Sequence, residues 1–148
     1  MKIRIFYVSY LIPYEVAVDV KPTSCPNPLN LGSKGVLPMA ILGEEDFDVN
    51  TIDITSIRLL DVAPLRSSYE DVAGPVLAGD ECECTSPGPD GYTDLILKFK
   101  TTRIAEEISE SFGDTTNGEV LILDLTGLLS DGTAISGSDC IFVVGQVP

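Results

Sequence analysis

The sequence predicts an all-β domain, a β-sandwich of about seven strands with one short helix. Several stretches alternate apolar and polar residues with a period of two, which is typical of half-buried strands. Only one stretch carries apolar residues at helical spacing, and turns rich in Gly, Pro and Asp separate the strands. The length of 148 residues suits a single domain over 1–148.

The N-terminal segment 1–14 predicts an additional strand. Ile3, Ile5 and Tyr7 alternate with the residues between them, and Pro13 ends the run. This strand either forms an edge of the same sandwich or is donated to a neighbouring subunit, since main-chain pairing permits both. The segment lacks the long apolar stretch and the cleavage site of a signal peptide.

The next segments alternate between strands and polar loops. Residues 15–20 place three valines on one face, and 36–42 form a short apolar run in which Pro38 indicates an edge strand or a bulge. The intervening segment 22–35 is rich in Pro, Asn and Gly and predicts a loop. The later strands are expected at 56–62, 92–99, 118–129 and 134–144, with a long loop over 63–89.

The predicted helix follows the strand at 92–99. Ile104, Ile108 and Phe112 recur at a spacing of four and give one apolar stripe. Thr102 is the expected N-cap, and Gly113 suits the position at which the helix ends. Packing of this stripe against the core explains it without a ligand.

The charge is strongly acidic. Nine basic residues stand against 23 acidic ones, for a net charge of -14. This excludes nucleic acid as a partner, because phosphate binding needs clusters of Lys and Arg. No apolar run reaches the roughly 20 residues needed to cross a bilayer, so no membrane insertion is expected. The acidic excess is either a solvated face or the surroundings of a cation.

Histidine and tryptophan are both absent. Histidine is the commonest general base and a frequent zinc ligand, so we expect no enzyme activity. Tryptophan is a usual platform for sugars, which weakens but does not remove the alternative of a carbohydrate-binding module. Its platforms would be Tyr14, Tyr69 and Tyr92.

The four cysteines predict disulfides rather than a zinc site. Cys82 and Cys84 form a Cys-Glu-Cys, whereas Cys25 and Cys140 stand alone far away, so the paired knuckles of zinc sites are missing. The favoured pairing joins Cys25 and Cys140 to the Cys82–Cys84 segment, although four cysteines allow three pairings. Disulfides place the protein in an oxidising compartment, outside the cell or on its surface.

One local pattern indicates a metal. Calcium loops of the EF type use carboxylates at positions 5 and 9, a glycine at 6 and a backbone carbonyl at 7. Asp90, Gly91, Tyr92 and Asp94 match these positions, with Tyr92 supplying its carbonyl oxygen. Positions 1 and 3 would fall on poor ligands, and a plain Asp-Gly turn explains the pattern equally well.

A wider set of motifs carries a resemblance. These motifs are VDVKP at 18–22, PNPLN at 26–30, GVLPMAIL at 35–42, FDVNTID at 47–53, EDV at 70–72, DGYTDLILKF at 90–99 and GSD at 137–139. With them the chain resembles, over roughly residues 16 to 145, a poorly characterised β-sandwich module of secreted and cell-surface proteins of bacteria and archaea.

The resemblance implies a dockerin-like Asp-rich calcium loop. In that module the EDV motif runs directly into the loop, which makes Asp71 the first ligand beside Asp90 and Asp94. Here an insertion at 73–89 separates them and brings Asp80, Glu81 and the Cys-Glu-Cys. These acids either supply the missing ligand, or the insertion has abolished the site.

We therefore expect a non-catalytic, calcium-stabilised extracellular module, with a structural, adhesive or self-assembly role. Its expected partners are copies of itself or other surface proteins, and its expected cofactor is Ca²⁺.

Overall fold

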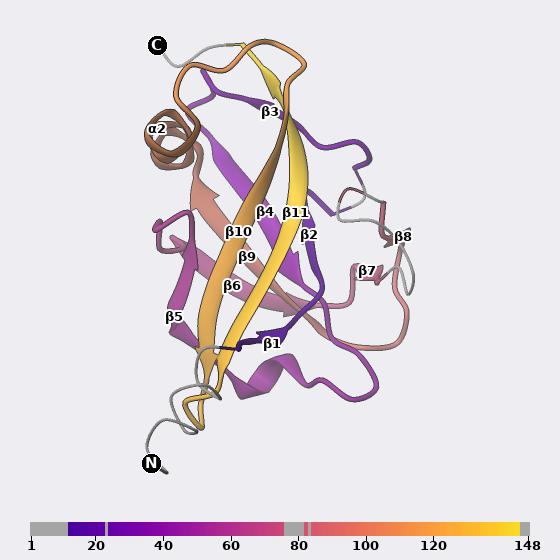
Figure 1. Ribbon diagram of the computed structural model, residues 1–148. Coiled ribbons are helices and arrows are strands. Elements are labelled where there is room, and N and C mark those ends of the chain that lie inside the picture. The colour runs from indigo at the N-terminus through magenta and orange to yellow at the C-terminus, as the bar shows by residue number, and fades with distance from the viewer. Residues whose placement is uncertain (1–11, 23, 76–81, 83, 146–148) are drawn as a thin grey trace, which may run out of the picture.

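The structure is a computed structural model that describes residues 12–22, 24–75, 82 and 84–145. Its strands form two main sheets that face each other, with β10 and β11 crossing in front of β4, β9 and β6 (Figure 1). The front sheet has the order β1 (Tyr14–Glu15), β11 (Ala134–Val144), β10 (Val120–Leu129) and β5 (Ile52–Leu59), with β3 (Pro28–Asn30) also paired to β11. The back sheet has the order β2 (Val18–Val20), β4 (Val36–Ile41), β9 (Asp94–Lys100) and β6 (Arg66–Glu70).

Three smaller elements complete the described chain. A short ladder pairs β7 (Ala73–Gly74) with β8 (Ser86–Pro87), and η1 (Val49–Thr51) is a single 3₁₀ turn before β5. The α-helix α2 (Thr101–Phe112) joins β9 to β10. Within the described residues, no helix is long and apolar enough to cross a membrane. The prediction of an all-β fold with one short helix is confirmed.

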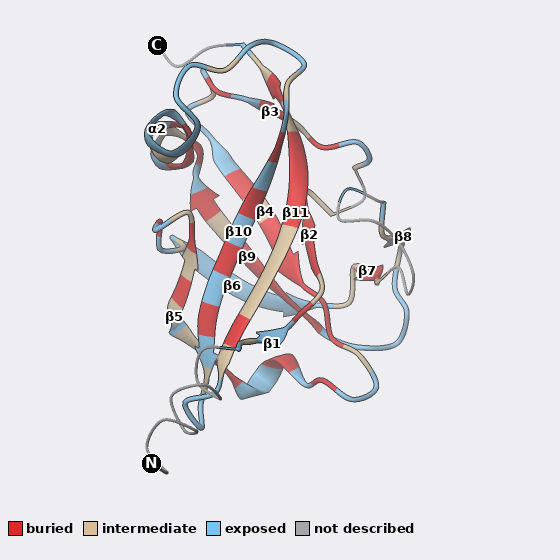
Figure 2. Cartoon of the chain, in the orientation of Figure 1, coloured by how far each residue is buried: buried red, intermediate tan, exposed pale blue. Residues whose placement is uncertain are grey.

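The core lies between the two sheets because their strands alternate buried and exposed residues. Along β10, Leu121, Leu123 and Leu125 are at most 5 % exposed, while the residues between them face solvent (Figure 2). Leu97 and Phe99 of β9 meet them from the back sheet and are fully buried. Each such side chain contributes roughly 1.5–3 kcal/mol when it leaves water.

Strand β9 is buried on both faces, and this feature positions the candidate site. Its outward-facing Ile96 is only 7 % exposed because it packs with Ala40, Leu42 and Ala73 in a second, smaller cluster. Ala73 belongs to β7, so the segment after β6 folds over the outer face of the back sheet. The start of β9 is thereby covered rather than left open to solvent.

The boundaries differ from the sequence prediction in ways that have physical reasons. The helix takes Lys100 as its N-cap without a side-chain cap bond, so the assignment of Thr102 as the cap was wrong. Strand β9 runs directly into α2, and the Thr101 amide donates instead to the Gly35 carbonyl at 3.1 Å. Gly113 ends the helix with φ 71°, as expected.

The predicted loops contain strands that the sequence pattern did not indicate. Strand β3 lies within 22–35, and β6, β7 and β8 lie within 63–89. The described chain therefore has eleven strands rather than about seven, several of them only two or three residues long. All residues of β6 are exposed, so it lacks the buried face on which period-two prediction depends.

Pro38 was expected at an edge or a bulge, yet β4 lies inside the back sheet between β2 and β9. Strand β2 pairs with β4 only as far as Val20 opposite Met39. Pro38 faces the end of β2, where its carbonyl accepts from the Lys21 amide at 2.8 Å. A proline is tolerated there because no partner strand continues to require its missing N–H.

Two disulfides fasten the inserted segment to both ends of the described chain. Cys25 pairs with Cys84 and Cys82 with Cys140, with Cα–Cα distances of 5.7 and 5.1 Å. The predicted linkage of Cys25 and Cys140 to the Cys82–Cys84 segment is confirmed. Cys82 is consequently held against β11, and Cys84 against the loop that follows β2.

Candidate metal centre

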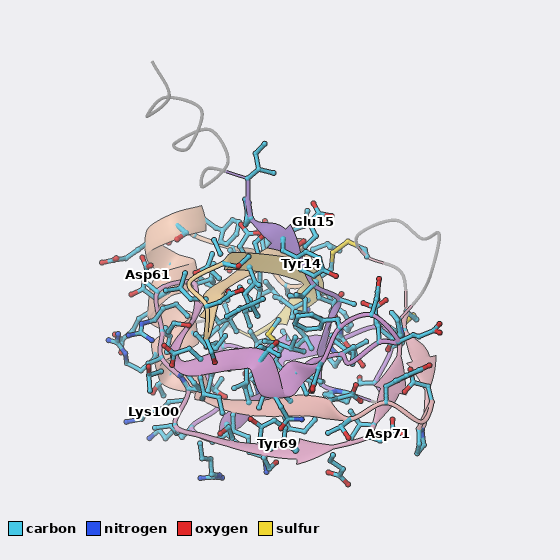
Figure 3. All side chains as sticks on the ribbon, turned by 90° about the horizontal axis from the view of Figure 1, so that it is seen from below. Tyr14, Glu15, Asp61, Tyr69, Asp71 and Lys100 are labelled. Carbon is cyan, nitrogen blue, oxygen red and sulfur yellow. A yellow bond between two sulfur atoms is a disulfide. The ribbon has the colours of Figure 1, made fainter. Side chains whose placement is uncertain are left out.

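The candidate centre forms where the chain leaves β6 and returns into β9. These strands pair antiparallel, and their last register pair is Glu70 with Asp94. Asp71 follows β6 directly, so it lies beside the first residue of β9 although the sequence separates the two by the whole insertion. In Figure 3, Asp71 lies at the opposite end of the sheet from Lys100, the last residue of β9.

Asp94 ties three backbone segments together. Its side chain is fully buried, and its Oδ1 accepts from the Gly43 amide at 2.8 Å. Its Oδ2 accepts from the amides of Val72 at 2.8 Å and Ala73 at 3.2 Å. These bonds hold the end of β4 and the beginning of β7 at the start of β9. Gly43 permits this approach, because a Cβ there would overlap the carbonyl oxygen of Thr93.

Asp71 and Asp90 are arranged by a turn that closes around them. The carboxylate of Asp71 accepts from the Asp90 amide at 3.1 Å and the Gly91 amide at 2.7 Å. Asp90 Oδ1 in turn accepts from the Tyr92 amide at 3.0 Å. Gly91 has a φ of 95°, which favours glycine, as the turn requires. The insertion therefore does not separate the predicted first ligand from the remainder of the loop.

The three carboxylates converge on one point. Asp71, Asp90 and Asp94 each offer an oxygen, and these oxygens all lie within 4.8 Å of one another. Ca²⁺ binds oxygen at about 2.3–2.6 Å, so two of its ligands are at most about 5 Å apart. The spacing therefore fits one calcium ion. Gly74 leaves room for this, since a Cβ there would lie 3.2 Å from Asp90 Oδ2.

The three residues differ in what they still have to offer a cation. Both oxygens of Asp94 already accept amide hydrogens, which leaves it few lone pairs. Asp71 accepts one bond on each oxygen, and Asp90 is exposed with one bond. Asp71 and Asp90 are thus the freer ligands, and Asp94 mainly holds the site in place.

An acidic depression of about 620 Å³ adjoins the three carboxylates. Its lining includes Asp90, Tyr92 and the three consecutive acids Glu44, Glu45 and Asp46. Burial, then the charges of Asp46 and Asp90, raise the pKa of Glu44 above its usual value. Burial likewise raises the pKa of Asp94, with the Asp90 charge adding to it and its amide bonds opposing it. The charges at this site therefore repel one another.

The remaining predicted ligands lie outside this cluster or outside the described residues. Tyr92 is 41 % exposed and lines the depression together with Asp90. Its carbonyl oxygen stays a predicted ligand. Asp80 and Glu81 fall outside the described residues. Sequence reasoning missed the acids at 44–46, because they follow β4 and reach the site only through the bond between Gly43 and Asp94.

The tyrosines of the carbohydrate-binding alternative lie on separate elements. Tyr14 is in β1 of the front sheet and Tyr69 in β6 of the back sheet, and they lie on opposite layers in Figure 3. The ring of Tyr14 stacks on Phe47 with centroids 5.6 Å apart. These two residues therefore do not form one flat platform with Tyr92.

Comparisons with protein-family models, with curated proteins and with solved structures found no match for this chain. The resemblance to a surface module of bacteria and archaea thus stays a prediction.

Proposed function

We propose that this protein is a non-catalytic, calcium-stabilised structural module of a secreted or cell-surface protein, acting in attachment or assembly. The observation that carries the proposal is the convergence of Asp71, Asp90 and Asp94 within 4.8 Å. Oxygen-only ligands of this kind suit a hard cation.

Electrostatics supplies the physical reason for an ion. Two unit charges about 4.8 Å apart repel by roughly 0.9 kcal/mol even in water, and by more where burial lowers the dielectric. Among the described residues, the ion pair within 4.0 Å is Arg103 with Glu106 on α2, so no basic side chain pairs with the three aspartates. A divalent cation converts this repulsion into attraction and fixes the turn at 90–94 against Asp71.

The proposed location follows from the disulfides. Both bonds fasten the inserted segment, and such bonds persist in oxidising compartments. Calcium is also plentiful there, and extracellular modules bind it with dissociation constants of about 0.1–1 mM. The disulfides and the proposed calcium site together favour a module that works outside the cell, where the surroundings are oxidising and calcium is plentiful.

The decisive experiment compares thermal unfolding of the full chain in about 10 mM calcium and in chelator. An ion that binds only the folded state at about a hundredfold excess over its dissociation constant adds roughly 2.7 kcal/mol. For a chain of this size we expect the melting temperature to rise by roughly 5–10 °C. An unchanged melting temperature overturns the proposal.

A matched pair of variants assigns the effect to the site. Asp90→Asn retains an oxygen that accepts from the Tyr92 amide but removes a charge from the cluster. Asp131→Asn makes the same change in the hairpin between β10 and β11, where Asp131 accepts from the Thr133 amide at 2.9 Å. We expect the calcium response to fall in Asp90→Asn and to persist in Asp131→Asn. An equal response in both variants places the ion elsewhere.

A further inference from the structure

A second polar site lies beneath the disulfides, apart from the centre at Asp71. It is a cavity of about 230 Å³, here called the disulfide cavity, where β2 of the back sheet meets β11 of the front sheet. All four cysteines line it, as do three polar side chains that are nine-tenths or more buried: Asp19, Asn27 and Asp139.

The carboxamide of Asn27 has an oxygen without a donor. Asn27 is 8 % exposed, and its Nδ2 donates to Asp139 Oδ2 at 3.3 Å and to the Cys140 carbonyl at 3.0 Å. Its Oδ1 is buried and has no hydrogen-bond partner among the described residues. Exchanging the two atoms would set the oxygen against two acceptors, so the bonds fix the amide orientation. A buried acceptor left unpaired indicates that something else occupies the cavity.

Two carboxylates lie beside it, and Asp19 has fewer hydrogen bonds than Asp139. Asp139 is 5 % exposed and accepts from the Val20 and Cys140 amides, each at 2.8 Å. Asp19 is 3 % exposed and, from the part of the chain that the structure describes, accepts one bond, from the Thr85 hydroxyl at 2.8 Å. Lys21 is the lysine nearest to Asp19 in the sequence, and its ammonium group donates a hydrogen bond to the Pro28 carbonyl at 2.7 Å. In the described chain no ion pair neutralises either aspartate.

We propose that the disulfide cavity binds a calcium ion through Asp19, Asn27 Oδ1 and Asp139. All three groups offer oxygen atoms as ligands, which calcium prefers, and the ion normally takes six to eight oxygen ligands. Water completes the shell, since each water fills about 30 Å³ and the cavity holds several. A water molecule alone would satisfy Asn27 but would leave the negative charges of both carboxylates without a cation.

Burial is the main cause that raises the pKa of both carboxylates. Burial, with the charges of Asp139 and Asp94 adding to it, raises the pKa of Asp19 to about 6. Burial also raises the pKa of Asp139 against the opposing effect of its hydrogen bonds.

Isothermal titration calorimetry of the metal-free full chain at about pH 7.5 tests this proposal. The double variant Asp71→Asn/Asp90→Asn removes the first centre, and we expect it to bind one calcium ion still. Adding Asp19→Asn, which keeps an oxygen for Thr85, should weaken that binding at least tenfold. Adding Asp124→Asn instead, on the exposed face of β10, should leave it unchanged.

Several outcomes overturn the proposal. A double variant that binds no calcium, or a triple variant with unchanged affinity, removes the second site. The same holds if Asp19→Asn alone raises the melting temperature equally in calcium and in chelator, because the cavity then holds only a proton or water. If the triple variant does not fold, the stoichiometry of the double variant decides.

The calcium titrations also test the two proposed sites independently. A wild-type chain that binds one ion, retained in the double variant and lost with Asp19→Asn, overturns the first centre and supports this one. One ion lost in the double variant does the reverse.

Discussion

Asp94 and Asp19 are both buried aspartates of the back sheet, yet their surroundings differ sharply. Asp94 begins β9 and accepts three backbone amides, whereas Asp19 lies in β2 and accepts one hydroxyl. Burial raises the pKa of both, and neighbouring acids add to the rise, but three backbone amides oppose it at Asp94 and a single hydroxyl opposes it at Asp19. Backbone amides thus compensate a buried carboxylate at the first, while the second is left for a ligand to compensate.

The two carboxylates therefore have different roles. Asp94 joins three segments and stabilises the fold whether or not an ion is present. Asp19 contributes a charge that is unfavourable without an ion and useful with one. Variants of the two residues should therefore differ in whether calcium changes their effect.

The largest expected effect comes from removing the disulfide next to Thr85, the partner of Asp19. Cys25→Ser/Cys84→Ser opens a bond that spans 59 residues of sequence, and chain entropy alone predicts a loss of about 4 kcal/mol. Denaturant unfolding measures the loss.

The same variant separates the two sites. Calcium binding at Asp71 and Asp90 should persist, because the amides that donate to Asp94 belong to residues 43, 72 and 73, none of which is next to Cys25 or Cys84. Binding at the disulfide cavity should weaken. Loss of both sites would show that the inserted segment also holds Asp90 in place.

Asp94→Asn is expected to have the next largest effect. The amide replaces one accepting oxygen with a donor that faces backbone N–H groups, and bonds to a charged acceptor are worth about 1.5–3 kcal/mol. We expect a fall in melting temperature of roughly 5–10 °C, in calcium and in chelator alike. Thermal unfolding in both conditions checks this, with Asp90→Asn as the comparison that loses only the calcium response. A variant that calcium fully rescues would contradict a structural role for Asp94.

Asp19→Asn should change the pH dependence of folding stability, with a smaller effect than Asp94→Asn has on the melting temperature and with a sign that the pKa shift defines. A carboxyl with a raised folded pKa holds its proton in the folded state over a range in which the unfolded chain has lost it. Stability therefore falls as the pH rises from the usual aspartate pKa of 3.8 through the folded-state pKa of about 6. In chelator, the wild type should lose stability across this window relative to Asp19→Asn, as denaturant midpoints at several pH values will measure. Parallel pH profiles would mean that Asp19 is compensated in a way the contacts do not show.

The sequence could predict what is local or strongly periodic. The alternation of Leu95, Leu97 and Phe99 predicted β9, and the spacing of Asp90, Gly91 and Asp94 predicted the turn that the structure contains. The cysteines predicted the linkage to the inserted segment because only one pair lay close together. In each case the signal lies within about ten residues, or in a rare residue type.

The rest depended on long-range geometry that no local pattern encodes. Asp139 lies 112 residues from Asn27 and 119 from Val20, yet it bonds to both. Gly43 reaches Asp94 across 51 residues. Strand β6 has no buried face and forms by backbone pairing with β9, so its polar sequence resembled a loop.

The smallest expected effect concerns the acidic depression beside the first centre. Glu44 interacts with the charge of Asp90 without belonging to the three converging carboxylates, so Glu44→Gln should weaken calcium binding only about twofold at low salt. Screening should abolish this difference at high ionic strength, because the Debye length falls to about 3 Å at 1 M. Calcium titrations at two salt concentrations measure it, with Glu106→Gln on α2 as the control. A tenfold loss that persists at high salt would instead make Glu44 a direct ligand, and the first centre would then extend across the depression to the end of β4.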